Sequence, residues 1–398
     1  MAKMKKISLF LSLIMLFGLI CSCTEKPEVT TAEDTTTQAQ TVTETETETE
    51  TETETETETE AETEEIKPVR TFTNPISTKS MPDPFITYYD GYYYGLATEV
   101  PNVRLYKNKT VEDLFINGEY KDVITVGAAI GGGRTLGWNE WAPELHYLPT
   151  TGRWYIYFAA CTDGFNFDSM RMHCLESDGD DPFGDYTYKG KTVNNRIGID
   201  QTVWYDEKSG EIYTAYCDFS SDNKGQVIML ASMNSPWSVG TKRVRVTEPE
   251  YAWEKRGTDA SNDGRVNEGP IFITHNGEIF LIYSASGCWS EWYSLGILHY
   301  VGEDTTRKNF LNPDNWVKSP KPIFEKANGV YGVGHCSFFT SPDGTETWMA
   351  YHGMATPDAG VEGRYAYIQK IDFADDGTPI LGEPLPRNTK IPVPSGEE

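Results

Sequence analysis

Asp83-Pro84-Phe85-Ile86-Thr87-Tyr88-Tyr89-Asp90-Gly91-Tyr92-Tyr93-Tyr94 is the stretch that decides the fold of this chain. It reads as a polar residue, a short strand, a glycine turn and an aromatic strand, and the same pattern occurs five times. The turns lie 61, 58, 67 and 67 residues apart, at Gly91, Gly152, Gly210, Gly277 and Gly344. A β pattern with a period of this size predicts a repeat architecture.

Each turn stands between an ionisable residue and an aromatic strand. The aromatic strands are residues 92–94, 154–157, 212–216, 279–283 and 348–351. The ionisable residues, eight to ten positions before the turns, are Asp83, Glu144, Asp200, Glu268 and His335. In a propeller blade the chain runs from the innermost strand outward, so the inner strands begin at the same end of the central channel. The pattern therefore predicts an all-β, five-bladed β-propeller with five ionisable residues at one mouth, completed by a hairpin at Asp376-Gly377.

The N-terminus has the features of a bacterial export signal. Three lysines at positions 3, 5 and 6 precede an apolar run over residues 7–20, which is short for a membrane span. The following Ile20-Cys21-Ser22-Cys23 resembles a lipobox. We expect residues 1–22 to be a lipoprotein signal peptide and Cys23 to carry the lipid anchor on the extracellular face of a bacterial membrane. The alternative is an ordinary cleaved signal and a secreted protein.

Residues 23–67 consist mainly of threonine and glutamate. Positions 24–66 hold sixteen acids and one base, a net charge of −15, with unbroken Thr-Glu alternation from Thr43 to Glu60. Low hydrophobicity and like charges predict a disordered, extended acidic linker. It precedes the propeller domain, residues 68–398. The formal net charge of −26 for the whole chain argues against nucleic acid as a partner.

The cysteines beyond Cys23 do not form a disulfide framework. Five remain, an odd number scattered over a large domain: Cys161, Cys174, Cys217, Cys288 and Cys336. One bridge would be compatible with an exported protein, and Cys161 with Cys217 is the candidate, because each ends the aromatic strand of adjacent repeats.

Three carboxylates at one mouth, Asp83, Asp200 and Glu268, indicate acid–base chemistry. Glycoside hydrolysis needs one carboxyl group to protonate the leaving oxygen and a second to activate water or attack the sugar. A third acid nearby separates their pKa values by raising that of its neighbour. Carboxylates on different blades favour the wider separation of about 6.5–9.5 Å, which leaves room for a water and gives inversion.

The residues around these positions resemble glycoside hydrolase family 43, five-bladed propeller enzymes that act on arabinose- and xylose-containing polysaccharides. The matching stretches are Asn74-Pro75-Ile76, Pro82-Asp83-Pro84-Phe85-Ile86, Trp141-Ala142-Pro143-Glu144-Leu145-His146, Ile199-Asp200, Val266-Asn267-Glu268-Gly269-Pro270, Tyr283-Ser284-Ala285-Ser286 and Gly329-Val330-Tyr331-Gly332-Val333-Gly334-His335. They extend from about residue 70 to the C-terminus. The resemblance implies that Asp83 is the general base, Glu268 the general acid and Asp200 the carboxylate that tunes the pKa of Glu268. It gives Glu144 no catalytic role, and we expect a structural carboxylate there.

The resemblance also implies roles outside the three acids. His335 matches an axial histidine that lies beside a calcium ion or a water cluster in the channel, and the alternative is a hydrogen-bonded core histidine. Calcium prefers oxygen ligands, so His335 would act through bound waters. Arg364 resembles an active-site arginine that contacts a substrate hydroxyl. No cofactor is required, and calcium in the channel would be structural.

Four tryptophans are candidate sugar platforms, because flat aromatic faces pack on the apolar faces of sugar rings. They are Trp138, Trp141, Trp289 and Trp292. Most tryptophans in a propeller pack between blades. We expect Trp141 and Trp289 to bind substrate, because each lies near an inner-strand motif.

These observations predict an inverting glycosidase that releases terminal α-L-arabinofuranosyl residues from arabinan or arabinoxylan of plant cell walls. A β-xylosidase or an endo-α-1,5-L-arabinanase with the same chemistry is the alternative. A second alternative is a non-catalytic surface propeller that binds glycans. We expect a monomer whose contact with the membrane is the N-terminal lipid alone.

Overall fold

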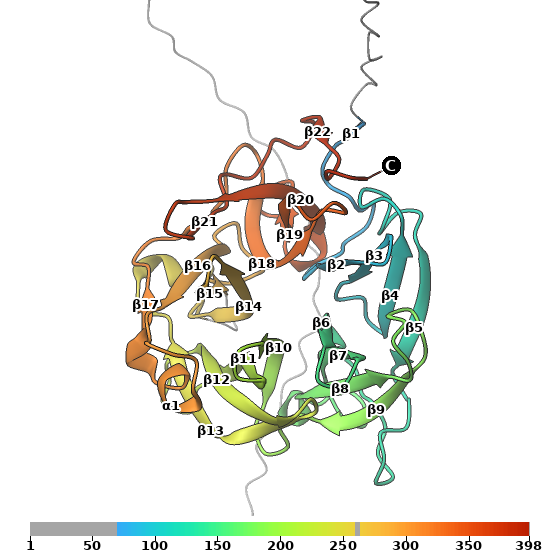
Figure 1. The fold of residues 1–398 in the computed structure, drawn as a ribbon, viewed down its shortest axis with the longest axis vertical. Helices are drawn as coiled ribbons and strands as arrows, with labels where there is room; N and C mark the ends of the chain where they lie inside the picture. The colour runs from blue at the N-terminus through green and yellow to red at the C-terminus, as the bar shows by residue number, and fades with distance from the viewer. Residues whose placement is uncertain (1–69, 259–262, 398) are drawn as a thin grey trace, which may run out of the picture. The chain divides into compact units, whose positions relative to one another are not determined.

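The computed structural model describes residues 70–258 and 263–397. They form five four-stranded antiparallel sheets arranged as blades around a central axis (Figure 1). In each blade the strands follow chain order from the axis outward, so the predicted all-β, five-bladed propeller is confirmed. The predicted signal peptide, Cys23 and the linker to residue 67 lie outside the described residues.

The blades are consecutive along the chain. Blade 1 consists of β2 (Phe85–Tyr89), β3 (Tyr92–Leu96), β4 (Asn102–Asn108) and β5 (Glu119–Thr125). Blade 2 consists of β6 (Trp141–Leu148), β7 (Arg153–Ala160), β8 (Arg171–Ser177) and β9 (Tyr186–Lys191). Blade 3 consists of β10 (Gly198–Asp206), β11 (Glu211–Phe219), β12 (Gln226–Ser235) and β13 (Ser238–Thr247). Blade 4 consists of β14 (Asn267–His275), β15 (Glu278–Ala285), β16 (Ser294–Tyr300) and β17 (Trp316–Lys318). Blade 5 consists of β18 (Tyr331–Thr340), β19 (Thr347–Met354), β20 (Arg364–Phe373) and β21 (Pro379–Ile380), so the hairpin predicted at Asp376-Gly377 does complete the ring.

Helical turns in the described residues are few and short. They are η1 (Phe167–Ser169), η2 (Ala252–Glu254), α1 (Arg307–Phe310), η3 (Pro313–Asn315) and η4 (Val361–Gly363). In the described part of the chain, no helix has the length and apolar character needed to cross a lipid bilayer.

The second strand of each blade explains the aromatic signature in the sequence. Each of these strands buries a tyrosine completely: Tyr93, Tyr157, Tyr213, Tyr283 and Tyr351. Neighbouring blades pack against both faces of each second strand, so the side chains on both faces are buried. Large aromatic side chains bury the most apolar surface there and fill the space between the blades.

The ring closes between blade 5 and the segment that leads into blade 1. The N–H groups of Ile76 and Met81 donate to the backbone oxygens of Ala366 and Arg364 on β20, both at 2.8 Å. Further out, β1 (Thr71–Phe72) pairs with β22 (Ile391–Pro392), which joins the two ends of the described domain. Strand β18 contacts β2 across the same seam.

Every inner strand begins near a residue in the left-handed region. The five residues are Asp83 (φ 58°), Ala142 (φ 43°), Asp200 (φ 56°), Gly269 (φ 52°) and His335 (φ 47°). In β6, β10, β14 and β18 the pairing register shifts across this residue. Bulges change the number of residues between the left-handed residue and the turn. Counting back from the turns in the sequence therefore selects Glu268, one residue from Gly269, and Glu144, two residues from Ala142.

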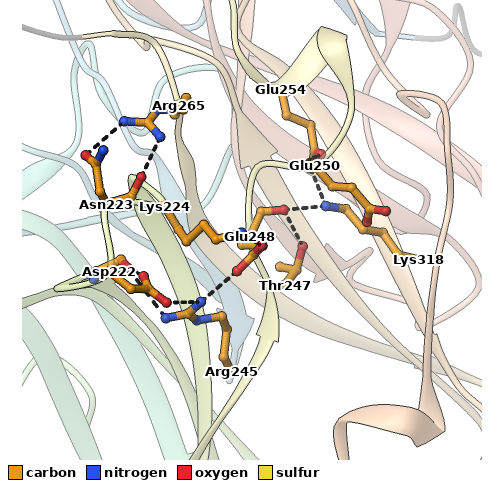
Figure 2. Close-up of polar contacts among 11 residues, drawn as sticks. Asp222, Asn223, Lys224, Arg245, Thr247, Glu248, Glu250, Glu254, Arg265 and Lys318 are labelled. Carbon is orange, nitrogen blue, oxygen red and sulfur yellow. Dashed lines mark hydrogen bonds and ion pairs between the residues drawn. The ribbon is translucent and has the colours of Figure 1, made fainter.

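The start of β14 is fixed by a buried ion pair between Glu254 and Lys318 (Figure 2). Nζ of Lys318 lies 2.6 Å from Oε1 of the fully buried Glu254 and donates to the backbone oxygen of Glu248 at 2.7 Å. The same Oε1 accepts a hydrogen bond of 3.0 Å from Nδ2 of Asn267. Since Asn267 precedes Glu268 directly, the ion pair sets where this acid enters the channel.

The candidate disulfide bridge is absent. Cys161 and Cys217 are both buried, free thiols. They lie at the ends of the second strands of two separate blades, and Sγ of Cys217 instead accepts a hydrogen bond from Nε2 of Gln226 at 3.4 Å.

The Glu254–Lys318 pair gives a stability prediction. Lys318→Met should lower the free energy of unfolding by about 3–5 kcal/mol, because it leaves a buried carboxylate without its counter-charge. Lys224→Met is the matched control, since Lys224 is half exposed and pairs with Glu248 at 2.9 Å on the surface. It should cost about 0–1 kcal/mol in equilibrium urea unfolding. Equal losses for the two variants would contradict the importance given to the buried pair.

Closure of the ring gives a second prediction. Ile391 on β22 is 5% exposed and Ile380 on β21 is 50% exposed, and both belong to two-residue strands. Ile391→Ala should lower the free energy of unfolding by about 2–5 kcal/mol, because it opens a cavity where the two ends of the described domain pair. Ile380→Ala should stay within about 0.5 kcal/mol of the original protein. If Ile391→Ala changed the free energy of unfolding as little as Ile380→Ala, the β1–β22 pairing would not stabilise the ring.

Candidate active site

A cavity of about 680 Å³ lies where the inner strands begin. Its lining includes seven residues that the sequence analysis predicts for the site: Asp83, Trp141, Asp200, Glu268, Trp289, His335 and Arg364. The structure thus brings together residues from all five blades. Cys23, the predicted lipid-carrying residue, lies outside the described part.

The Asp83 carboxylate is surrounded by donors and positive charge. Its Oδ2 accepts a hydrogen bond of 2.6 Å from Oγ1 of Thr98. Its Oδ1 lies 3.3 Å from a nitrogen of each of three basic side chains, His335, His352 and Arg364. Burial opposes ionisation, but the charges of His335 and Arg364 and the contact with His352 outweigh it, so the pKa of Asp83 lies far below its ordinary value. This side chain is therefore held as a carboxylate. Burial lowers the pKa of His352 itself to about 4, and its Nδ1 accepts a hydrogen bond of 3.2 Å from the backbone N–H of Asp83, so His352 is a neutral neighbour near neutral pH.

Glu268 has the opposite electrostatic setting. Its Oε2 accepts a hydrogen bond from Nε2 of Gln226 at 2.8 Å, and its Oε1 accepts one from the Tyr293 hydroxyl at 2.9 Å. Burial raises the pKa of Glu268 above its ordinary value, although the His335 charge and both hydrogen bonds act in the other direction. Two buried carboxyls in one cavity are thus pushed apart in pKa, as an acid and a base of one reaction require.

Asp200 is the third buried carboxyl. Its Oδ2 accepts a hydrogen bond of 3.1 Å from the backbone N–H of Gly269, the residue after Glu268. Burial, together with the negative charges of Glu268 and Asp83, raises the pKa of Asp200 to about 7. Asp200 therefore fixes the backbone beside Glu268, and the charges of the two carboxyl groups interact.

His335 packs against the inner strand of blade 4. Gly269 has a φ of 52°, and a Cβ at this position would lie 3.0 Å from Cγ of His335, so a larger residue would strain the backbone and crowd the ring. The His335 backbone N–H donates to Oγ of Ser284 at 2.8 Å. Burial opposes protonation of the ring, but the surrounding carboxylates, Asp83 foremost, raise the pKa of His335 above its ordinary value.

His335 is the residue that the sequence analysis places beside a calcium ion or a water cluster. Its Nδ1 lies against Asp83, and calcium prefers oxygen donors. Within residues 70–258 and 263–397, no group of three or more His, Cys, Asp or Glu side chains is arranged to hold a metal ion. Calcium held through waters stays a prediction.

The candidate tryptophan platforms separate into two pairs. Trp141 and Trp289 line the cavity, and Nε1 of Trp289 donates to the backbone oxygen of Gly257 at 2.7 Å. Trp138 and Trp292 do not belong to the lining and are 45% and 37% exposed. The structure thus places in the cavity the two tryptophans that the sequence analysis favours.

Glu144 stands apart from the other carboxylates. It is buried but does not line the cavity, and its Oε2 lies 2.6 Å from Nε2 of His146. This is the setting that the sequence analysis expects for a structural carboxylate.

Sequence reasoning missed four residues that hold the acids: Thr98, Gln226, Tyr293 and His352. His352 directly follows the aromatic run 348–351, so a search along the repeated strands for polar residues would have found it. Thr98 follows β3 and Gln226 begins β12, where no motif marks them. The rings of Tyr293 and His352 stack at 5.3 Å with an interplanar angle of 5°. A hydrogen-bond donor to Glu268 therefore packs on a neighbour of Asp83.

The chain is similar to known proteins along most of its length. The sequence profile described as Glycosyl hydrolases family 43 matches residues 72–379. An extracellular exo-α-(1→5)-L-arabinofuranosidase of Streptomyces avermitilis is 32% identical over 332 residues, 80% of this chain and 64% of that protein. The α-L-arabinofuranosidase 43 of Humicola insolens is 31% identical over 331 residues, 80% of this chain and 65% of that protein. This chain thus spans less than two thirds of the length of either relative.

A solved structure extends the likeness to three dimensions. The crystal structure of an α-L-arabinofuranosidase from Lactobacillus brevis superposes with a TM-score of 0.68 and 33% sequence identity. The match covers 80% of this chain and 98% of that one. The profile match and the relatives that are more than 30% identical along four fifths of this chain lead to one conclusion: it belongs to glycosyl hydrolase family 43.

Proposed function

We propose that this protein is an inverting glycoside hydrolase that releases terminal α-L-arabinofuranosyl residues from arabinan- or arabinoxylan-type polysaccharides. One observation carries the proposal: a single cavity holds Asp83 as a carboxylate among basic side chains and keeps Glu268 buried with a raised pKa. The arabinofuranosidase names of the relatives support the choice of sugar.

In the proposed reaction, Asp83 is the general base and Glu268 the general acid. Asp83 accepts a proton from water as the water oxygen bonds to the anomeric carbon. The bond from that carbon to the glycosidic oxygen breaks, and Glu268 gives its proton to this leaving oxygen. Exchange with solvent then returns a proton to Glu268 and removes one from Asp83. A single displacement of this kind inverts the anomeric configuration.

The other lining residues support this step. We assign to Asp200 the fixing of the Gly269 backbone, which its 3.1 Å hydrogen bond supports, and the tuning of the Glu268 pKa, which the repulsion between the two carboxylates supports. Arg364 would bind a sugar hydroxyl, and Trp141 and Trp289 would pack on sugar rings.

For the N-terminus we propose export and lipid anchoring. Residues 1–22 would be removed as the signal, Cys23 would carry the lipid, and residues 23–67 would hold the propeller domain away from the membrane. Two relatives named extracellular are consistent with export.

A substrate panel tests the proposed function. The original protein should release arabinose from an aryl α-L-arabinofuranoside and from arabinan, with little action on an aryl β-xyloside. Glu268→Gln should lower kcat/KM on arabinan by about 10²–10⁴-fold, because the leaving oxygen loses its proton donor. Glu144→Gln is the matched control and should keep most activity, since Glu144 lies outside the cavity lining.

The panel also separates the alternatives. Preference for the β-xyloside would indicate a xylosidase, and release of internal fragments from arabinan would indicate an endo-arabinanase. Binding of arabinan without any hydrolysis would indicate a glycan-binding propeller. Equal activity of Glu268→Gln and the original protein on arabinan would contradict the acid assignment.

The charges around Asp83 predict the pH dependence of the reaction. Because the Arg364 guanidinium, after His335, helps to lower the pKa of Asp83, Arg364→Met should raise this pKa and move the acid limb of kcat/KM from strongly acidic pH to higher pH, by about 1–3 units. Arg364→Lys keeps the charge and should leave the limb closer to its original position. The measurement is the pH profile on an aryl arabinofuranoside. A lower kcat/KM with an unmoved limb would mean that Arg364 acts on the substrate alone.

A further inference from the structure

Aromatic side chains from blades 2 and 3 line one side of the cavity. Trp141, Phe167 and Phe219 all belong to its lining. The ring centroids of Trp141 and Phe167 are 6.4 Å apart, and those of Phe167 and Phe219 are 5.2 Å apart, with the second pair edge to face. These three rings make a continuous apolar wall in a cavity whose centre is charged.

Two further aromatic side chains stand outside the cavity on the segments that lead to this wall: Phe165 lies two residues before Phe167, and Trp138 three residues before Trp141. Phe165 is 73% exposed and Trp138 is 45% exposed. The backbone N–H of Trp138 donates to the oxygen of Gly164 at 3.2 Å, which places it beside the residue before Phe165. We call Phe219, Phe167, Trp141, Trp138 and Phe165 together the aromatic ridge.

The two loops that carry the outer part of the aromatic ridge brace one another. Leu136 and Thr162 form a β-bridge, and the N–H of Thr135 donates to Oδ1 of Asp163 at 2.7 Å. Arg134 forms an ion pair with the same Asp163. Fixing these loops before a ligand arrives lowers the entropy cost of binding. Large exposed apolar side chains on a braced surface next to a cavity indicate a binding surface.

We propose that the aromatic ridge binds the uncharged polysaccharide chain that carries the scissile arabinosyl residue. Phe165 and Trp138 would then hold sugar units beyond the bond that is cut. The nearness of Phe165 and Trp138 in sequence to the cavity-lining Phe167 and Trp141 supports this occupant, because a polysaccharide whose terminal residue enters the cavity must leave it along one wall. Aromatic rings suit it, since they offer flat apolar faces at low entropy cost. The inference rests on the proposed function.

The experiment compares two substrates that differ beyond the cleaved bond. Phe165→Ala and the double variant with Trp138→Ala are assayed on linear arabinan and on an aryl α-L-arabinofuranoside, which has no sugar past that bond. The ratio of kcat/KM on arabinan to kcat/KM on the aryl substrate should fall about five- to tenfold, mainly through KM. Tyr120→Ala is the matched control, because Tyr120 is 55% exposed on the outer strand of blade 1. It should leave the ratio unchanged.

A binding measurement separates this inference from the proposed function. Glu268→Gln, with and without Phe165→Ala, is run in affinity electrophoresis through gels that contain arabinan. Phe165→Ala should weaken retardation. If the protein hydrolysed none of the substrates but Phe165→Ala still weakened retardation, the proposed hydrolase function would be wrong. Binding of arabinan by the aromatic ridge would still be supported. Hydrolysis with an unchanged kcat/KM ratio and unchanged retardation would contradict polysaccharide binding by the aromatic ridge and leave the proposed function intact. The exposed rings would then bind a partner other than polysaccharide.

Discussion

The contact of Oδ1 of Asp83 with three basic side chains is the interaction on which the rest of the site depends. His335, His352 and Arg364 come from β18, β19 and β20, three successive strands of blade 5, whereas Asp83 precedes β2 of blade 1. The contact therefore crosses the seam where the ring closes. A carboxylate in an enclosed cavity would otherwise tend to take up a proton, because burial raises its pKa. Closure of the propeller is what supplies the opposing charge, so the fold and the ionisation of Asp83 are coupled.

Glu268, the acid of the same cavity, is held by different interactions. No basic side chain forms an ion pair with Glu268 among the described residues. Neutral donors, Gln226 and Tyr293, orient both of its oxygens, and burial dominates its pKa. The buried Glu254–Lys318 pair holds the start of β14 from behind, through Asn267. One carboxyl is thus held among positive charges and the other by burial and neutral hydrogen-bond donors, which is how two carboxyls in one cavity can serve as base and acid.

Much of this was readable from the sequence because the fold repeats. Turn glycines and buried tyrosines recur with a period, and the period places Asp83, Asp200 and Glu268 at one mouth. The sequence did not show which residues occupy equivalent positions in the five blades, because bulges shift Glu144 and Glu268 relative to the left-handed residues of the inner strands. The supporting residues were missed for a related reason: Thr98 and Gln226 lie on strands or loops where nothing repeats. The outer rings of the aromatic ridge stand on loops for the same reason, since loops are the part of a propeller that the repeat leaves free to vary.

The central claim is that the cavity sets opposite proton occupancies on two carboxyls. The most direct measurement is a ¹³C NMR titration of the protein labelled at aspartate and glutamate side-chain carboxyls, with Asp83→Asn and Glu268→Gln to assign the two signals. We expect Asp83 to remain ionised down to strongly acidic pH and Glu268 to lose its proton above the ordinary range for glutamate. If both carboxyls titrated together near their ordinary values, or Asp83 took up its proton at higher pH than Glu268, the account would be wrong.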